Sequence, residues 1–149
     1  MSQIFPIIPP PDKTFWSLGI FILLMLGILC LFFYIAYSSS HLQVELNAEE
    51  LRIRGDLYGR NIPVSSLVVN DASIIELDKQ SPYYPSWRTN GIGLPGYLSG
   101  WFKLKNGDKG LLFVTDKKQV LYLPTDEDYS LLMSIKEPEN FLEALQKLP

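Results

Sequence analysis

The sequence is poor in the side chains that build metal and disulfide sites, with one cysteine and one histidine in 149 residues. A single cysteine forms no intrachain disulfide, and the two residues together cannot supply a cysteine- or histidine-based metal cluster, so we expect no metal or other cofactor. Charge is also scarce: 13 Lys and Arg face 16 Asp and Glu, a net charge of −3. Without a basic surplus, binding to nucleic acid is not expected.

Hydrophobic residues, at 47%, are by contrast abundant, and many of them gather in one uncharged run over 15–37. A helix of this length reaches about 34 Å, which exceeds the ~30 Å hydrocarbon core of a bilayer. Trp16 lies near one end of the run and Tyr34 and Tyr37 near the other, where aromatic rings favour the membrane interface. The sequence predicts a single transmembrane helix over 15–37 with these three residues at the interfaces.

A cleaved signal peptide is the alternative interpretation, because Ala36 and Ser38 have the small side chains and the spacing that signal peptidase requires. The apolar run is longer than the roughly 7–15 residues of a typical signal core, which favours an uncleaved anchor. Cys30, inside the run, is interpreted as a small hydrophobic residue. Lys13 and the α-amine precede the run and acidic residues follow it, a small bias that places the C-terminal domain on the extracytoplasmic side.

Proline-rich and serine-rich segments flank the apolar run. Pro9 to Pro11 are consecutive, so the helix is expected to begin near Asp12 or Thr14, either of which can cap it. The predicted organisation is a proline-rich tail over 1–14, the transmembrane helix over 15–37, a linker over 38–41 and one domain over 42–149.

Alternating apolar and polar residues predict a domain made mainly of short β-strands. Leu42, Val44 and Leu46 begin the pattern, and Asn106–Gly107 gives the strongest hairpin signal. Residues 78–99 are rich in proline and glycine and are expected to form a long irregular excursion. Strands are expected over 42–47, 51–54, 57–62, 68–77, 101–105, 111–114, 120–123 and 131–135.

The chain ends in a predicted amphipathic helix. Pro138 suits the first helical position, and Glu139 suits the positive end of the helix dipole. The apolar face of this helix comprises Phe141, Leu142, Leu145 and Leu148. Short antiparallel strands closed by one such helix are typical of a pleckstrin-homology-like (PH-like) fold. The expected class is therefore mainly β: a PH-like antiparallel β-barrel or sandwich that a C-terminal α-helix caps.

Four segments of the domain carry a more specific resemblance. They are RTNGIGLPGY over 88–97, GWFKLKNG over 100–107, YLPT over 122–125 and EPENF over 137–141. Through them the chain resembles bacterial PH-domain proteins that place one transmembrane helix before a PH-like domain, and the resemblance covers most of 42–148. It implies that fold and a single-pass position in the bacterial inner membrane, and it implies no substrate or catalytic residue. Glu137 departs from the aspartate usual at its position, and glutamate is the poorer helix cap.

The segment 83–101 has a composition that points to binding. Arg88 can form paired hydrogen bonds with a carboxylate or phosphate, and Asn90 can recognise an amide. Glycines allow close backbone approach, and aromatic rings supply flat contact area. The predicted ligand- or partner-binding residues are Trp87, Arg88, Asn90, Tyr97 and Trp101. The alternative is structural: the glycines shape bulges and turns, the aromatic rings cover the barrel, and Arg88 ties the loop to a strand.

No set of residues points to catalysis. His41 has no recognisable nucleophile or acid beside it, and the acidic trio at 126–128 (Asp126, Glu127, Asp128) lacks the spaced ligands and turn glycine of a calcium loop. Acidic side chains outnumber basic ones over 38–149, which disfavours phosphoinositide binding. We therefore predict a non-enzymatic, membrane-tethered interaction module, a scaffold or accessory subunit that binds membrane or envelope proteins. The alternative is a sensor of a small ligand or lipid head group through the loop over 83–101.

Overall fold

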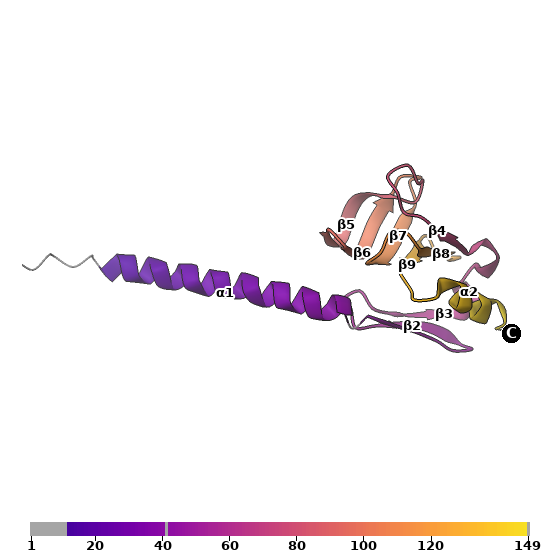
Figure 1. Ribbon diagram of the computed structural model, residues 1–149, viewed down its shortest axis with the longest axis horizontal. Coiled ribbons are helices and arrows are strands. Elements are labelled where there is room, and N and C mark those ends of the chain that lie inside the picture. Colours follow the sequence, from indigo (N-terminus) through magenta and orange to yellow (C-terminus); the bar gives the residue numbers. More distant parts are fainter. Residues whose placement is uncertain (1–11, 41, 149) are drawn as a thin grey trace, which may run out of the picture. The chain divides into compact units, whose positions relative to one another are not determined.

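The computed structural model describes residues 12–40 and 42–148. They divide into a helical unit that ends at Tyr37 and a compact unit, called the domain below, that begins at Ser38. Helix α1 (Asp12–Ser40) makes up the described part of the helical unit and continues beyond it through Ser40; over Lys13–Tyr37 it is long and apolar enough to cross a membrane (Figure 1).

Helix α1 begins at Asp12, as predicted, directly after a proline run that cannot donate helical hydrogen bonds. Trp16, Tyr34 and Tyr37 are all exposed on it, the tryptophan near the start and the tyrosines toward the end. The helix continues through Ser40, so most of the residues expected as a linker are helical, because serines without glycine or proline do not stop a helix. The proline-rich tail over 1–11 and His41 lie outside the described residues.

Two β-sheets make up most of the domain (Figure 1). The small sheet has the order β1-β2-β3 and the large sheet the order β4-β8-β9-β7-β6-β5. The strands are β1 (Gln43–Leu46), β2 (Glu50–Arg54), β3 (Asn61–Pro63), β4 (Ser73–Ile75), β5 (Pro85–Leu94), β6 (Tyr97–Leu104), β7 (Lys109–Val114), β8 (Val120–Pro124) and β9 (Ser130–Met133).

The predicted class is confirmed: an apolar N-terminal helix, a mainly β domain consistent with a PH-like fold, and a C-terminal helix. The two sheets remain separate and do not close into a barrel. Strands β7 and β9 pair in parallel, against the antiparallel expectation, while the other strand pairs are antiparallel. The parallel pair arises because β9 lies between β7 and β8 in the sheet. In a simple antiparallel meander, β8 would pair with β7 and β9 would follow on the outer side of β8.

Alternate residues of the central strands belong to two hydrophobic clusters, one for each face of the large sheet. In β7, Leu111 and Phe113 belong to the first cluster, which also contains the buried side chains of the small sheet. Leu112 and Val114 belong to the second cluster, which the loop over 76–84 covers. A strand with both faces buried loses its apolar–polar alternation, as the continuous burial of β7 and β9 shows.

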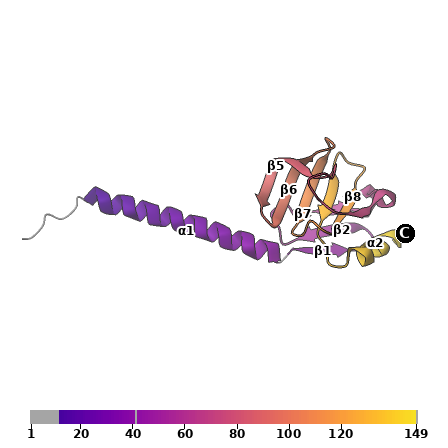
Figure 2. The ribbon, with the colours of Figure 1, turned by 45° about the horizontal axis from the view of Figure 1, so that its top comes forward.

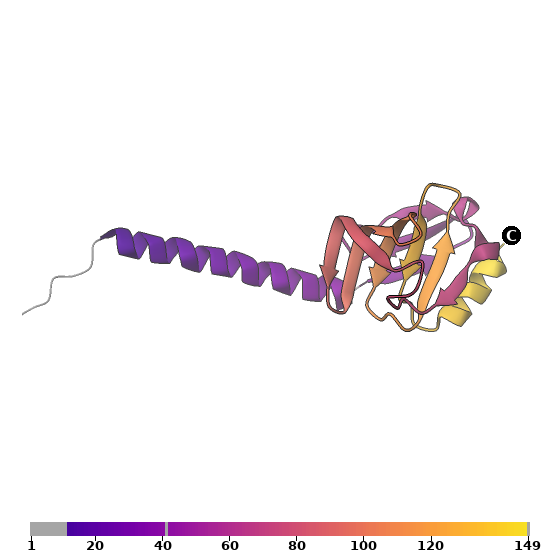
Figure 3. The ribbon, with the colours of Figure 1, turned by 90° about the horizontal axis from the view of Figure 1, so that it is seen from above.

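The C-terminal helix α2 (Pro138–Gln146) forms as predicted, with proline at its start and Glu139 in its first turn. Leu145 is buried in the first cluster, and the three other residues of the predicted apolar face are half-buried against it. Figure 2 shows α2 beside the small sheet. Figure 3 shows α2 at one end of the domain, in yellow, and the β5–β6 hairpin, in pink, at the other. The helix thus caps the core away from the hairpin.

Three sequence expectations are wrong in detail. Residues 57–60 form a turn, so only Asn61–Pro63 of the strand expected over 57–62 is paired. The 3₁₀-helix Val69–Asp71 interrupts the strand expected over 68–77. The excursion expected over 78–99 contains all of β5 and the start of β6. Its Gly, Ser, Thr and Asn residues show no alternation, and pairing with β6 supplies the order that local propensity lacks.

Candidate functional site

The β5–β6 hairpin carries all five predicted binding residues. Its tip is Leu94–Tyr97, where Pro95 and Gly96 occupy the two turn positions. Gly96 has a φ of 77°, which the third residue of a type II turn requires. Strand β5 is an edge of the large sheet, so one of its sides is unpaired within the described residues.

Two β-bulges interrupt the pairing of β5 with β6. At the first, Ser86 Oγ donates a hydrogen bond of 2.9 Å to the carbonyl of Lys103. At the second, Thr89 Oγ1 donates one of 3.0 Å to the carbonyl of Trp101. Each hydroxyl therefore gives a β6 carbonyl a partner where the ladder is interrupted.

Gly91 and Gly100 face each other where the two strands of the hairpin approach closely. A Cβ on Gly91 would lie 2.4 Å from the Ser99 carbonyl oxygen, and one on Gly100, whose φ is 104°, would lie 2.6 Å from the Asn90 carbonyl oxygen. The ring of Tyr58, from the β2–β3 turn, packs beside Gly100, and its hydroxyl donates a 3.0 Å hydrogen bond to Asn90 Oδ1. The glycines thus admit the facing strand and the Tyr58 ring.

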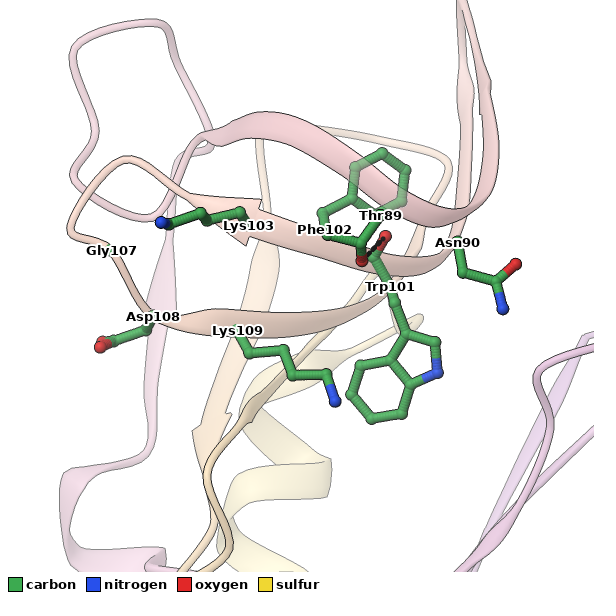
Figure 4. A pocket seen from close by; sticks show the side chains of 8 residues that line it. All are labelled: Thr89, Asn90, Trp101, Phe102, Lys103, Gly107, Asp108 and Lys109. Carbon is green, nitrogen blue, oxygen red and sulfur yellow. Dashed lines mark hydrogen bonds between the residues drawn. The ribbon is translucent and has the colours of Figure 1, made fainter.

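The bulge at Thr89 separates the predicted binding residues onto two faces. Arg88 pairs with Phe102, whereas Asn90 pairs with Trp101. Phe102 and Trp101 project from opposite faces of β6 (Figure 4), and they pack in different clusters. The predicted residues therefore do not form one site.

Arg88 lies on the first of these faces, and it lines a depression of about 330 Å³ together with Trp87, Gly93 and Phe102. Arg88 Cδ and Nη1 lie 3.9 Å from the position that a Cβ on Gly93 would take. Arg88 is exposed and makes no hydrogen bond or ion pair with the residues that the structure describes.

Asn90 and Trp101 lie on the second face and line a pocket of about 440 Å³, called the Trp101 pocket below (Figure 4). Two cations, Lys103 and Lys109, also line it, and its carboxylate, Asp108, accepts a 2.6 Å hydrogen bond from Asn106 Nδ2. The complete lining is Thr89, Asn90, Trp101, Phe102, Lys103, Gly107, Asp108 and Lys109.

The Trp101 ring is held among charged and aromatic neighbours. Lys109 Nζ lies 4.1 Å and Arg60 Cζ 4.8 Å from the ring centroid, while Tyr129 packs edge-on at 5.1 Å. Burial, with a further contribution from Glu127, raises the pKa of the Tyr129 phenol, against an opposing effect of Arg60. Arg60 and Lys109 are not among the residues predicted from the sequence, because only tertiary packing brings residues of the β2–β3 turn and β7 to this ring.

Tyr97 lies in an internal network instead of a binding surface. Its hydroxyl donates a hydrogen bond to the carboxylate of Asp56, which also accepts hydrogen bonds from Ser99 Oγ at 2.6 Å and the Tyr58 N–H at 2.9 Å. Asp56 stands in the β2–β3 turn, so the network joins the small sheet to β6. Sequence analysis also missed Asp56, although the preceding Gly55, with a φ of 88°, marks a turn.

The profile of the bacterial PH domain matches residues 42–148. The chain belongs to this family. No curated protein and no solved structure gives a significant match. The matched region includes every strand of both sheets and α2, so the Trp101 pocket and the Asp56 network are parts of the PH domain.

Glu137 and the acidic trio at 126–128 are two other features of the PH domain that the sequence singled out. Glu137 precedes α2 with a φ of 55°, gives the helix backbone no side-chain hydrogen bond and accepts one of 2.7 Å from Asn140 Nδ2. The acidic trio at 126–128 is exposed in the β8–β9 turn. Within 12–40 and 42–148, no cluster of three His, Cys, Asp or Glu is placed to hold a metal ion.

Proposed function

We propose that the protein is a membrane-tethered, non-enzymatic PH-domain module that binds an acidic segment of another membrane or envelope protein in the Trp101 pocket. The observation that carries the proposal is the Trp101 indole, with Lys109 and Arg60 at 4.1 and 4.8 Å from its centroid, in the wall of a pocket of about 440 Å³. Tryptophan and arginine are the side chains most enriched at the energetic centres of protein interfaces.

The charges of the pocket set the chemistry of the partner. Lys103 and Lys109 outnumber Asp108, and that carboxylate already accepts a hydrogen bond from Asn106. A carboxylate of the partner would form charge-assisted hydrogen bonds with the two ammonium groups, while an apolar part of the same segment would pack on the indole. The partner segment is therefore expected to combine acidic and apolar side chains.

The edge of β5 supports docking through side chains. A regular edge strand could pair with an extended partner segment, but β-bulges oppose such pairing. The bulges at Ser86 and Thr89 leave the regular part of β5 short. The Trp101 pocket, which opens beside them, offers the alternative contact.

A membrane tether makes weak binding sufficient. Confinement by α1 to the membrane of the partner raises the effective concentration of the domain, so a modest affinity gives high occupancy. We place α1 in the bacterial inner membrane with the domain on the extracytoplasmic side. The intact mass of the purified protein should include residues 1–37, alkaline carbonate should leave the chain in the membrane, and protease added to spheroplasts should cleave the domain. A mature N-terminus near Ser39 would disprove the anchor.

Site-specific photo-crosslinking in native membranes tests the partner. A photoreactive residue at position 103 should give a discrete protein adduct, identified by mass spectrometry, and the same residue at position 118 in the β7–β8 turn should not. Lys109→Glu should weaken that adduct about tenfold or more, equivalent to about 1.4 kcal/mol, whereas Lys118→Glu should leave it unchanged. A lipid or metabolite adduct at position 103, or an adduct that Lys109→Glu does not weaken, would reject the acidic protein partner.

A further inference from the structure

The described part of the PH domain exposes three large hydrophobic side chains: Trp87, Leu57 and Leu94, which are 72%, 64% and 37% exposed. Single exposed hydrophobic residues are ordinary on a protein surface, but a group of them marks a surface that contacts something. Whether these three form a group depends on where the fold places the β2–β3 turn and the β5–β6 hairpin.

The Asp56 network joins Leu57 to the tip of the hairpin. Leu57 follows Asp56, whose carboxylate accepts the hydrogen bond of the Tyr97 hydroxyl. Tyr97 pairs with Leu94 across the tip. Both exposed leucines therefore stand on segments that a side-chain hydrogen bond holds together.

Six residues lie between Trp87 and Leu94 in the sequence. Trp87 lines one depression with Gly93, the neighbour of Leu94, and with Arg88. β-Bulges bend a strand, and β5 has two of them between Pro85 and Asn90. The exposed hydrophobic residues of the β2–β3 turn and the hairpin, Trp87, Leu57 and Leu94, are called the apolar tip below, and Arg88 lines the same depression as Trp87.

The chain enters the domain at this same end. Gln43, the first residue of β1, pairs with Arg54, which is two residues before Asp56. The β1–β2 turn, with Ala48, lies at the other end of these two strands. From Tyr37 to Gln43 the chain has three helical residues and three more, a span of at most about 15 Å. The chain, coming from the predicted transmembrane helix, thus enters the domain at the end that carries the apolar tip.

We propose that the apolar tip rests in the head-group layer of the bilayer that α1 spans, with the Arg88 guanidinium on lipid phosphates. Tryptophan favours this layer, leucines on a turn can enter its apolar side, and arginine pairs with phosphate. The layer is roughly 5–8 Å thick on each side of the hydrocarbon core, within reach of the short connection. The inference rests on the proposed function in one respect, that α1 is a membrane anchor.

Fluorescent labelling of the full chain in lipid vesicles tests the contact. Single cysteines at Leu57→Cys and Leu94→Cys, in a Cys30→Ser background, would carry an environment-sensitive dye. Ala48→Cys provides the matched control, because residue 48 is exposed at the opposite end of β1 and β2. In vesicles that contain lipids with a quencher near the head group, the dyes at 57 and 94 should shift to the blue and lose emission, while the dye at 48 should do neither.

The native Cys30 separates failure of this inference from failure of the anchor. A dye on Cys30 should be quenched by lipids with a quencher deep in the acyl chain if α1 spans the bilayer. Quenching at 30 with no quenching at 57 and 94 would overturn the apolar tip alone, and no quenching at 30 would overturn the anchor. A blue shift at 57 and 94 without lipid quenching would place a protein, such as a second copy, on the tip and would also overturn the inference.

The role of Arg88 has its own measurement. Quenching at position 94 should be greater in vesicles that contain an anionic lipid than in vesicles of phosphatidylcholine alone, and Arg88→Ala should remove that difference. Lys147→Ala, an exposed lysine directly after α2, should preserve it, because α2 lies at the end of the domain opposite the hairpin (Figure 3). A difference that survives Arg88→Ala would show that Arg88 does not contact the head groups.

Discussion

Ser99 donates a hydrogen bond of 2.6 Å to the carboxylate of Asp56 and thereby joins β6 of the large sheet to the β2–β3 turn of the small sheet. Ser99 is fully buried, so its hydroxyl has no access to water as an alternative partner. The same carboxylate accepts the hydroxyl proton of Tyr97. This half-buried acid therefore helps to set the relative positions of the small sheet and the hairpin.

Replacement of this acid should destabilise the domain. Asp56→Ala leaves the buried Ser99 hydroxyl unpaired and removes hydrogen bonds to a charged acceptor, so the free energy of unfolding should fall by about 1.5–3 kcal/mol. Urea unfolding of the full chain in detergent, followed by near-UV circular dichroism, measures the change. Asp128→Ala, at an exposed turn, should stay within about 0.5 kcal/mol of the native protein. Equal unfolding midpoints for the two variants would contradict the role of the network.

Two glycines of β5 should differ sharply in their tolerance of a methyl group. Gly91→Ala places a Cβ 2.4 Å from a backbone oxygen of β6 and should cost about 1–3 kcal/mol, because backbone atoms cannot move aside cheaply. Gly93→Ala meets its nearest atoms at 3.8 Å or more and should change the stability by less than about 0.5 kcal/mol. Thermal melts of both variants test the difference, and a Gly91→Ala protein as stable as Gly93→Ala would refute the close approach of the strands.

The cap of the core should depend on Leu145. This side chain is 1% exposed in the first cluster, so Leu145→Ala should reduce the free energy of unfolding by about 2–5 kcal/mol. Gln146→Ala, the exposed neighbour on the same helix, is the control and should have little effect. If the two variants unfolded at the same urea concentration, α2 would not be a packed part of the domain.

Alkaline pH should weaken the fold through Tyr122. Burial raises the pKa of its phenol above the ordinary 10.0, against the opposing effect of the Ser130 hydroxyl, which donates to it at 3.2 Å. The folded state therefore holds this proton more tightly than the unfolded state. The resulting stabilisation is complete below pH 10 and is lost as the pH rises through the folded-state pKa.

An absorbance titration of tyrosinate in native protein and in Tyr122→Phe isolates this group. The component that the substitution removes should ionise above the ordinary pKa of 10.0, and the native protein should lose more stability than the variant above about pH 10. A component that ionises at the ordinary pKa would contradict the burial of Tyr122.

Sequence analysis predicted the elements that local pattern determines. The apolar helix, the C-terminal helix from Pro138 and the turn at Asn106–Gly107 all form where expected, because each depends on residues close together in the chain. Of the two hairpin turn residues, only Gly107 adopts a positive φ, of 94°. Strand β5 could not be predicted in the same way, since its residues show no alternation and its bulges depend on hydroxyl contacts with β6.

The candidate site shows the same division. The sequence by itself determined that the chain has an apolar anchor-length helix, a mainly β PH domain and a binding-like composition around Arg88. The tertiary structure decided how those residues are distributed: one bulge sends Arg88 and Asn90 to different faces, and Asp56 draws Tyr97 into the interior. It also brought Arg60 and Lys109 to Trp101 and placed the exposed Leu57 beside the hairpin tip. Local sequence determines the backbone preference and the hydrophobic period of each segment. The face of the sheet on which a side chain lies depends on the register between strands, and register is set by contacts between residues far apart in the chain.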